Sequence, residues 1–132
     1  MASQSKRVVG GLGDDLGVLV MRGDAVRPTK RPSNPVISAR VANLRQGGFL
    51  LLERVEEEPG DWYVQVRMRE DNTFQLEHRD GVPAEHYLTR TVSRDRVVAA
   101  MVGWAVGDPG WRDSFMWNNI GSCFEHHGAR DD

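Results

Sequence analysis

Polar and apolar side chains alternate through residues 62–91, which predicts a three-stranded antiparallel meander with strands at about 62–69, 73–79 and 85–91. The even positions of the first strand carry Trp62, Val64, Val66 and Met68, and its odd positions are polar or amphipathic. Successive side chains of a strand point to opposite faces of its sheet, so one face is expected to be buried. A sheet whose other face meets water is typically antiparallel.

The alternation also predicts how the strands pair, because a shift of one residue would turn each apolar side chain to water. In the second strand the inward positions are taken as Phe74, Leu76 and His78, and in the third as His86 and Leu88. The pairs expected across the two hairpins are Met68–Phe74, Val66–Leu76, Leu76–Leu88 and His78–His86. Two histidines are therefore expected side by side on the buried face.

A fourth strand and two helices complete the predicted fold. Residues 49–55 form an apolar run bounded by glycine and by an acidic stretch that contains proline, which predicts a strand. A capping residue before Pro35 predicts a helix over about 35–45, and Ser93 starts another over about 93–106. We expect an α+β fold in which a four-stranded antiparallel meander carries both helices on its apolar face.

The predicted domain organisation is one α+β domain over residues 33–126. Residues 1–32 contain five glycines and two prolines and no sustained hydrophobic period, so they are expected to form a flexible basic leader. A short strand at Val18–Met21 is the one element considered within it. Residues 127–132 are expected to be a disordered tail.

Charge is distributed unevenly along the chain. Residues 1–45 hold eight basic and three acidic side chains, whereas residues 46–132 hold nine basic and sixteen acidic ones, which together give the formal charge of −2. An acidic domain repels nucleic acid and favours a basic protein partner. The alternative is that the basic segment 27–45 contacts nucleic acid, through Arg27, Lys30, Arg31, Arg40 and Arg45.

No catalytic or cofactor motif accompanies this predicted fold, so we expect a protein that is not an enzyme and that binds no cofactor. The pair His78 and His86 is the nearest approach to a metal site, but two ligands are too few, and histidines at the rim of the core are the favoured interpretation. The single Cys123 excludes an internal disulfide. The apolar stretches are too short to span a membrane, and aspartates stand where a signal peptide needs apolar residues, so a cytoplasmic protein is expected.

The chain has four tryptophans, of which two fall on predicted core faces. These are Trp62 and Trp104. Trp111 and Trp117 lie in a less regular stretch, where burial and exposure remain open alternatives. Exposed tryptophans would be candidate anchors of an interface.

The polar face of the predicted sheet is the candidate binding surface. Tyrosine and arginine beside adaptable amides are typical of interface hot spots, although an ordinary hydrated face is the competing interpretation. The candidate binding residues are Tyr63, Gln65, Arg67, Gln75, Glu77, Arg79 and Tyr87.

Over just over half of its length the chain resembles small uncharacterised actinobacterial proteins. The residues that carry the resemblance are Phe49 to Leu52, Tyr63 to Val66, Phe74 to Gly81, Val97 to Trp104 and Asp113 to Trp117. The order of strands and helices is also similar to that of immunity proteins encoded beside bacterial polymorphic toxins. The resemblance implies binding without catalysis, an acidic domain that covers a toxin's active site, and no cofactor. We therefore expect a protein-binding module, with toxin neutralisation as its specific form.

Overall fold

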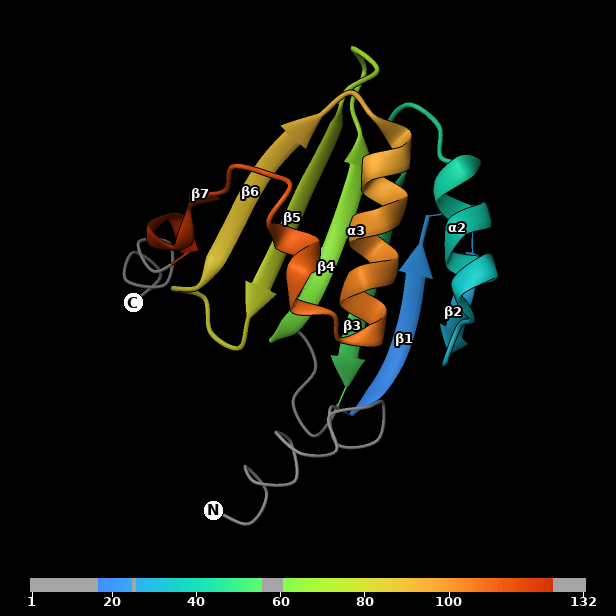
Figure 1. Cartoon of the computed structure of the whole chain (residues 1–132), viewed down its shortest axis with the longest axis horizontal. Coiled ribbons are helices and arrows are strands. Elements are labelled where there is room, and N and C mark those ends of the chain that lie inside the picture. Colours follow the sequence, from blue (N-terminus) through green and yellow to red (C-terminus); the bar gives the residue numbers. More distant parts are fainter. Residues whose placement is uncertain (1–16, 25, 56–60, 125–132) are drawn as a thin grey trace.

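A computed structural model of the chain shows an open antiparallel sheet of seven strands in the order β2-β1-β3-β4-β5-β6-β7 (Figure 1). The structure describes residues 17–24, 26–55 and 61–124. The strands are β1 (Val18–Gly23), β2 (Val26–Lys30), β3 (Phe49–Val55), β4 (Trp62–Met68), β5 (Phe74–Asp80), β6 (His86–Thr91) and β7 (Asn118–Asn119). The helices are α2 (Asn34–Ala42), α3 (Arg94–Val106) and the 3-10 helix η2 (Pro109–Arg112). The α+β class with an antiparallel sheet is confirmed.

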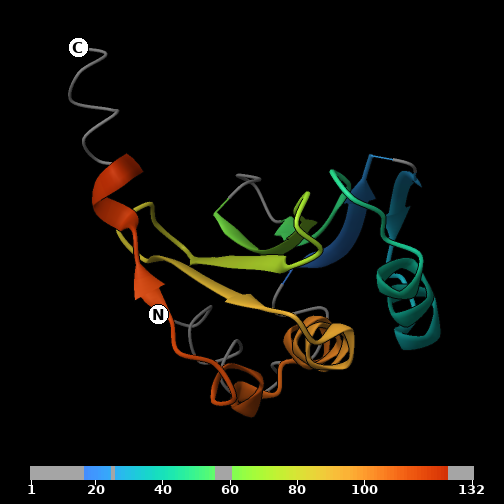
Figure 2. The same cartoon turned by 90° about the horizontal axis from the view of Figure 1, so that it is seen from above.

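The core lies between the sheet and the helices α2, α3 and η2, which pack on one side of it (Figure 2). Figure 2 looks along α3 and shows this helix and η2 on the same side of the central strands. The core side chains that are at most 1% exposed include Met21, Leu50, Leu52, Val64, Val66 and Leu76 from the sheet, with Ile37, Val41, Val97 and Met101 from α2 and α3. Burial of these aliphatic side chains is the main force that fixes the helices on this face.

The side of the sheet that faces away from α2, α3 and η2 is called the open face below. Its residues follow from the strand registers and the alternation of side chains. From β3 to β6 they are Phe49, Leu51, Glu53, Val55, Tyr63, Gln65, Arg67, Gln75, Glu77, Arg79, His86, Leu88 and Arg90.

Both predicted helices are present, and a serine caps the start of each. The Ser33 hydroxyl accepts a hydrogen bond from the backbone N–H of Val36 at 3.3 Å, and the Ser93 hydroxyl accepts one from Arg96 at 3.2 Å. Each cap satisfies one of the amide groups that a helix start leaves unpaired. Helix α3 ends at Gly107, whose φ of 81° lies in the left-handed region that glycine adopts without steric cost.

The first predicted hairpin is confirmed in register. Met68 lies opposite Phe74 and Val66 opposite Leu76. Strand β3 has the predicted bounds, and β4 and β5 begin or end within one residue of theirs. Strong alternation on both strands leaves only one register that buries all the apolar side chains.

The predicted register of the second hairpin is wrong by one residue. Thr89 rather than Leu88 lies opposite Leu76, and Tyr87 rather than His86 lies opposite His78. The cause is that Asp80 extends β5 and its N–H bonds the carbonyl of Glu85 at 2.9 Å, so the loop is shorter than expected. The faces of β6 are therefore reversed, with Tyr87 and Thr89 toward the helices.

The N-terminal part of the sheet was predicted only in part, since the short strand considered at Val18–Met21 falls within β1. Residues 18–30, predicted to belong to a flexible leader, form the hairpin β1–β2, which pairs with β3 through contacts such as Met21 with Leu52. Strand β2 contains Pro28 and lies at the sheet edge, where a missing N–H donor is tolerated. With β7 beside β6, the sheet has seven strands rather than the four predicted. Residues 1–16 of the predicted leader and the predicted tail 127–132 lie outside the described residues.

Trp62 is a further correction, because it is 46% exposed rather than part of the core. Its ring lies against Gly81, where an added Cβ would come within 2.7 Å of the Trp62 ring atom Cζ2. Gly81 also has a φ of 93°. A glycine is thus needed here both for its backbone conformation and for the close approach of the ring.

No helix in the described part of the chain is both long enough and apolar enough to cross a membrane.

Candidate functional site

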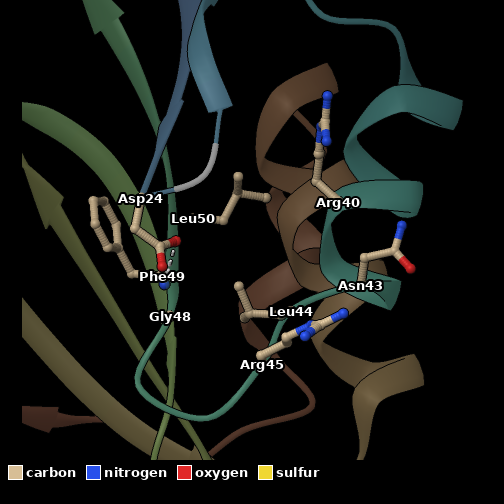
Figure 3. A pocket seen from close by; sticks show the side chains of 8 residues that line it. All are labelled: Asp24, Arg40, Asn43, Leu44, Arg45, Gly48, Phe49 and Leu50. Atoms are coloured by element: carbon tan, nitrogen blue, oxygen red, sulfur yellow. Dashed lines mark hydrogen bonds between the residues drawn. The ribbon is translucent and has the colours of Figure 1, made fainter.

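A pocket of about 160 Å³ lies between α2 and the start of β3 (Figure 3). Arg40 and Arg45 border it, and Asp24 lies across from them. The Asp24 carboxylate accepts a hydrogen bond from the backbone N–H of Phe49 at 3.2 Å, so it closes the end of the sheet. The pocket contains two of the predicted nucleic-acid contacts, Arg40 and Arg45, but none of the candidate binding residues of the sheet.

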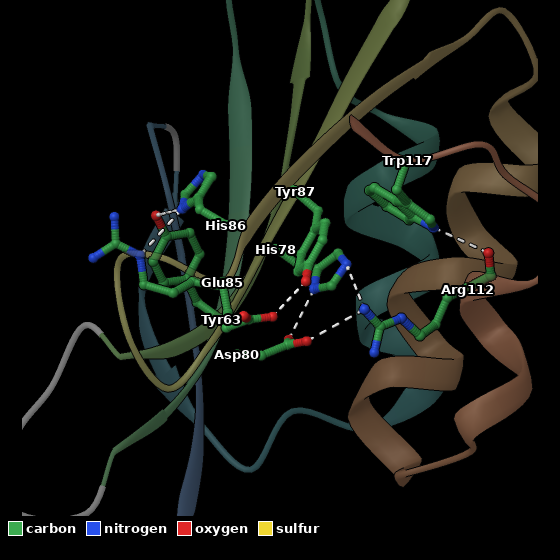
Figure 4. Close-up of polar contacts among 9 residues, drawn as sticks. Tyr63, His78, Asp80, Glu85, His86, Tyr87, Arg112 and Trp117 are labelled. Atoms are coloured by element: carbon green, nitrogen blue, oxygen red, sulfur yellow. Dashed lines mark hydrogen bonds and ion pairs between the residues drawn. The ribbon is translucent and has the colours of Figure 1, made fainter. Parts of the chain in front are cut away.

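Two fully buried histidines occupy opposite faces of the sheet, as Figure 4 shows. His78 of β5 points toward the helices, and His86 of β6 belongs to the open face. The predicted His78–His86 pair is therefore wrong, since the one-residue shift of β6 separates the two rings. Within the described ranges there is no group of three or more histidine, cysteine, aspartate or glutamate side chains that could hold a metal ion.

His86 joins three polar side chains of the open face. Its Nε2 lies 2.8 Å from Oε1 of Glu77, and its Nδ1 lies 3.1 Å from Nε of Arg79 and 3.4 Å from the Tyr63 hydroxyl. The arginine Nε–H donates, so Nδ1 accepts and the proton of the neutral imidazole is assigned to Nε2. Nε2–H then donates to the Glu77 carboxylate.

Glu77 extends this network along the open face. Gln75 donates from Nε2 to Oε2 of Glu77 at 2.8 Å, and Arg69 donates from Nη1 to Oε1 of Gln75 at 2.8 Å. The hydrogen bond from His86 lowers the pKa of Glu77, which outweighs the opposing effect of burial, and Gln75 lowers it further. Both carboxylate oxygens of Glu77 are thus occupied, and six side chains, including Tyr63 and Arg79, are joined in one network.

Aromatic rings support the guanidinium groups of this face. The Arg79 guanidinium lies 5.6 Å from the Tyr63 ring centre and 4.7 Å from that of Phe124, and the Arg67 guanidinium lies 5.5 Å from that of Phe49. Stacking of this kind stabilises a partly exposed arginine and limits its conformers. Burial raises the pKa of the Tyr63 hydroxyl, which the Arg79 charge partly offsets, so Tyr63 is a neutral donor.

The open face is basic, although the chain as a whole is acidic. On this side of β1, β3, β4, β5 and β6 the charged side chains are Arg22, Arg67, Arg79, Arg90, Glu53 and Glu77. Glu53 is buried and bonded to Arg22 at 2.8 Å, and Glu77 is bonded to His86. The Arg67 charge also helps to lower the pKa of Glu77, so this carboxylate offsets part of the positive charge of the face.

The structure brings together six of the seven predicted binding residues. Tyr63, Gln65, Arg67, Gln75, Glu77 and Arg79 all lie on the open face. The prediction is wrong for Tyr87, which points toward the helices because of the register of β6. Two residues of β6 that were not predicted, His86 and Arg90, lie on this face instead. Phe124 was also missed, and its ring packs over His86 at a ring-centre distance of 4.3 Å. The Asp80–Gly81 sequence was the available signal, since it favours a turn after Asp80.

His78 forms a second polar centre beneath the helices. Its Nδ1 lies 2.9 Å from Oδ1 of Asp80, and Nη2 of Arg112 lies 3.4 Å from its Nε2 and 3.3 Å from Oδ2 of Asp80. Burial raises the pKa of Asp80, but the hydrogen bond from His78 and the charges of His78 and Arg112 outweigh it and lower the pKa overall. This triangle of polar groups ties η2 to β5.

Aromatic side chains enclose the His78 ring. Tyr87 is stacked on it at 4.9 Å, and Trp111 and Trp117 meet it edge-on at 4.9 and 4.6 Å. Both tryptophans are half-buried, and Nε1 of Trp117 donates to the Arg112 carbonyl at 3.0 Å. The Tyr87 hydroxyl donates to Glu85, which raises the pKa of Tyr87. The tryptophans thus pack the C-terminal segment onto the sheet, and this centre is mainly structural.

In comparisons with known proteins, no family model, curated protein or solved structure matched this chain. The resemblance to immunity proteins stays a prediction, and the functional argument rests on the open face itself.

Proposed function

We propose that this protein is a non-catalytic protein-binding module that binds its partner through the open face. The observation that carries the proposal is the network from Arg69 through Gln75, Glu77 and His86 to Arg79. It orders half-exposed polar side chains before any partner is present. A surface ordered in advance loses less conformational entropy on binding.

The geometry of His86 supports binding rather than catalysis. Its Nε2–H is directed to Glu77 and its Nδ1 accepts from Arg79, so both ring nitrogens already have protein partners. Phe124 packs over the His86 ring, and His86 is fully buried. A general base needs a free lone pair within reach of a substrate proton, but the Nδ1 lone pair of His86 already accepts a hydrogen bond from Arg79.

Toxin neutralisation is the specific form of this proposal. Its support is the resemblance in the order of strands and helices to immunity proteins, together with the ordered polar side chains of the open face. In this form, the protein blocks a toxin by covering it and takes no part in chemistry.

Affinity purification from the native host, with the full chain tagged, tests the proposal. The double substitution Tyr63→Ala with Gln65→Ala removes half-exposed contacts from the middle of the open face. Arg40→Ala, at an exposed position on α2, is the matched control. We expect the double variant to lose partners that the wild type and the control retain. Retention of every partner by the double variant, with an unchanged melting temperature, would refute the proposal.

A second candidate function is nucleic-acid binding through β2 and α2. The observation in its favour is that Arg27, Lys30, Arg31, Arg40 and Arg45 are all exposed, and that residues 26–52 contain no acidic side chain. Binding of a labelled DNA or RNA at low salt, lost when these five residues are replaced by glutamine, would support it. An absence of binding at low salt would exclude it.

A further inference from the structure

Three arginines surround Gln75 at the end of the open face nearest the β4–β5 turn. Arg67 on β4 and Arg90 on β6 lie directly opposite Gln75 on its two neighbouring strands. Arg69, just beyond the end of β4, donates to the Gln75 side chain at 2.8 Å. The sheet therefore gathers three positive charges around one neutral amide.

These guanidinium groups have donors to spare. Nε of Arg69 is buried and has no hydrogen-bond partner in the part of the chain that the structure describes. Within the described ranges the Arg67 side chain has one hydrogen bond, to the Gly47 carbonyl at 3.3 Å, and Arg90 is exposed. Among the described residues none of the three arginines forms an ion pair. The guanidinium groups of Arg67 and Arg90 are exposed, so their N–H groups can donate to a ligand that carries carboxylates.

A pocket of about 390 Å³ opens beside Arg67 and Arg69. Glu70 and Asp71 also line it, but Asp71 is already bonded to Thr73, whose hydroxyl lies at 2.7 Å and whose N–H lies at 3.1 Å. These bonds lower the pKa of Asp71, so it remains ionised and committed to the turn. The Gly47 carbonyl borders the opening, and Arg90 lies further across the sheet.

We infer that this arginine cluster, Arg67, Arg69 and Arg90, binds a carboxylate-rich segment of a partner protein. Guanidinium groups bind carboxylates through paired, charge-assisted hydrogen bonds, and the aromatic ring beneath Arg67 holds one such group in position. The inference rests on the proposed function and deepens it, because it names the chemistry of the partner. It also replaces the basic partner expected from the acidic charge of residues 46–132 with an acidic one.

A protein segment fits the arginine cluster better than a nucleic acid does. Glu70 and Asp71 line the pocket beside Arg67 and Arg69, and Glu77 is bonded to Gln75, so a continuous phosphate backbone that crosses the site would pass close to acidic side chains. A peptide places its carboxylates only at chosen positions, so it can meet the arginines and avoid the acidic side chains.

Fluorescence anisotropy with defined probes tests the inference. A short labelled oligo-glutamate peptide is titrated with the full-length protein at low salt, beside an oligo-lysine peptide and a single-stranded oligonucleotide of equal length. We expect saturable binding of oligo-glutamate that weakens as salt rises. The double variant Arg67→Gln with Arg90→Gln should weaken it by about fivefold or more, from two lost charge contacts.

The matched control is Arg27→Gln with Arg40→Gln, which removes the same charge from exposed positions on β2 and α2. The control should bind oligo-glutamate as the wild type does. Equal weakening in both double variants would show an effect of net charge alone and would overturn the inference. Preference for oligo-lysine, or oligonucleotide binding that depends on Arg67 and Arg90, would overturn it as well.

The same variants separate this inference from the proposed function. The partner could be lost when Tyr63 and Gln65 are replaced but kept when Arg67 and Arg90 are replaced. This result would support protein binding by the open face and would refute the inference that the partner binds through a carboxylate-rich segment. If neither double variant loses a partner, the proposed function fails too.

Discussion

Glu77 and His86 are bonded at 2.8 Å across β5 and β6, and this contact links the amide and arginine side chains at one end of the open face to Tyr63 and Arg79 at the other. It exists only because the register of β6 brings His86 to this face. The hydrogen-bond network of the open face therefore depends on the register in which β5 and β6 pair.

Glu77→Gln should destabilise the protein by about 1–2 kcal/mol, because it replaces charge-assisted hydrogen bonds with neutral ones and sets an amide against the Gln75 donor. Urea unfolding followed by tryptophan fluorescence measures the change. Glu70→Gln, at an exposed position, is the control and should change stability little. Equal effects of the two substitutions would show that the network adds no stability.

Acid should destabilise the protein through Glu77 and Asp80. The pKa of each carboxyl is lowered in the folded state from ordinary values of 4.5 and 3.8. The stability they contribute is therefore fully present above those values and is lost as the pH falls through the lower, folded-state pKa. Asp80→Asn should reduce this loss in urea unfolding measured from neutral pH down to pH 3. A variant with the same acid dependence as the wild type would contradict the role of Asp80.

The register of β6 is tested by a lysine at each of two neighbouring positions. Leu88 is half-exposed on the open face, whereas Thr89 is 7% exposed beneath the helices. Leu88→Lys should cost less than about 1 kcal/mol, and Thr89→Lys about 3 kcal/mol or more, because it buries a charge. Urea unfolding distinguishes the two. The opposite order of effects would favour the register expected from sequence alone.

Gly81→Ala should cost about 1–2 kcal/mol, from its φ of 93° and from the clash with Trp62. Gly110→Ala is the control, because the nearest atom to its added Cβ is 3.4 Å away. The double variant Trp62→Ala with Gly81→Ala should recover the part of the loss due to the clash. Thermal unfolding measures all three, and a neutral Gly81→Ala would show that the turn does not need glycine.

The strands that could be predicted from the sequence are those in which apolar and polar residues alternate along the whole strand. Strands β4 and β5 alternate strongly, so their pairing and the six open-face residues on them followed from Val64, Val66 and Leu76. Strand β6 has both polar and apolar side chains on each face, and Leu88 led to the prediction that its even positions point inward. Its true inward side chain, Tyr87, packs with His78 beside Trp111 and Trp117, which come much later in the chain.

The rest of the site depended on contacts between distant segments. His86 and Arg90 could be placed only once the register of β6 was known, and Phe124 contacts His86 from beyond β7. Pro28 concealed an edge strand, since proline in a short segment normally argues against a strand. The acidic charge of residues 46–132 predicted a basic partner, whereas the inference of an acidic partner uses only the arginine cluster of the open face, in which Arg90 could be placed only from the structure.

Site-specific photo-crosslinking in the native host tests the central claim most directly. A photoreactive amino acid is placed at Gln65 in the middle of the open face, or at Arg40 on α2 as the control. We predict a crosslinked adduct with another protein from position 65 and none from position 40. Adducts from position 40 alone, or equally from both positions, would contradict the assignment of the open face as the binding surface.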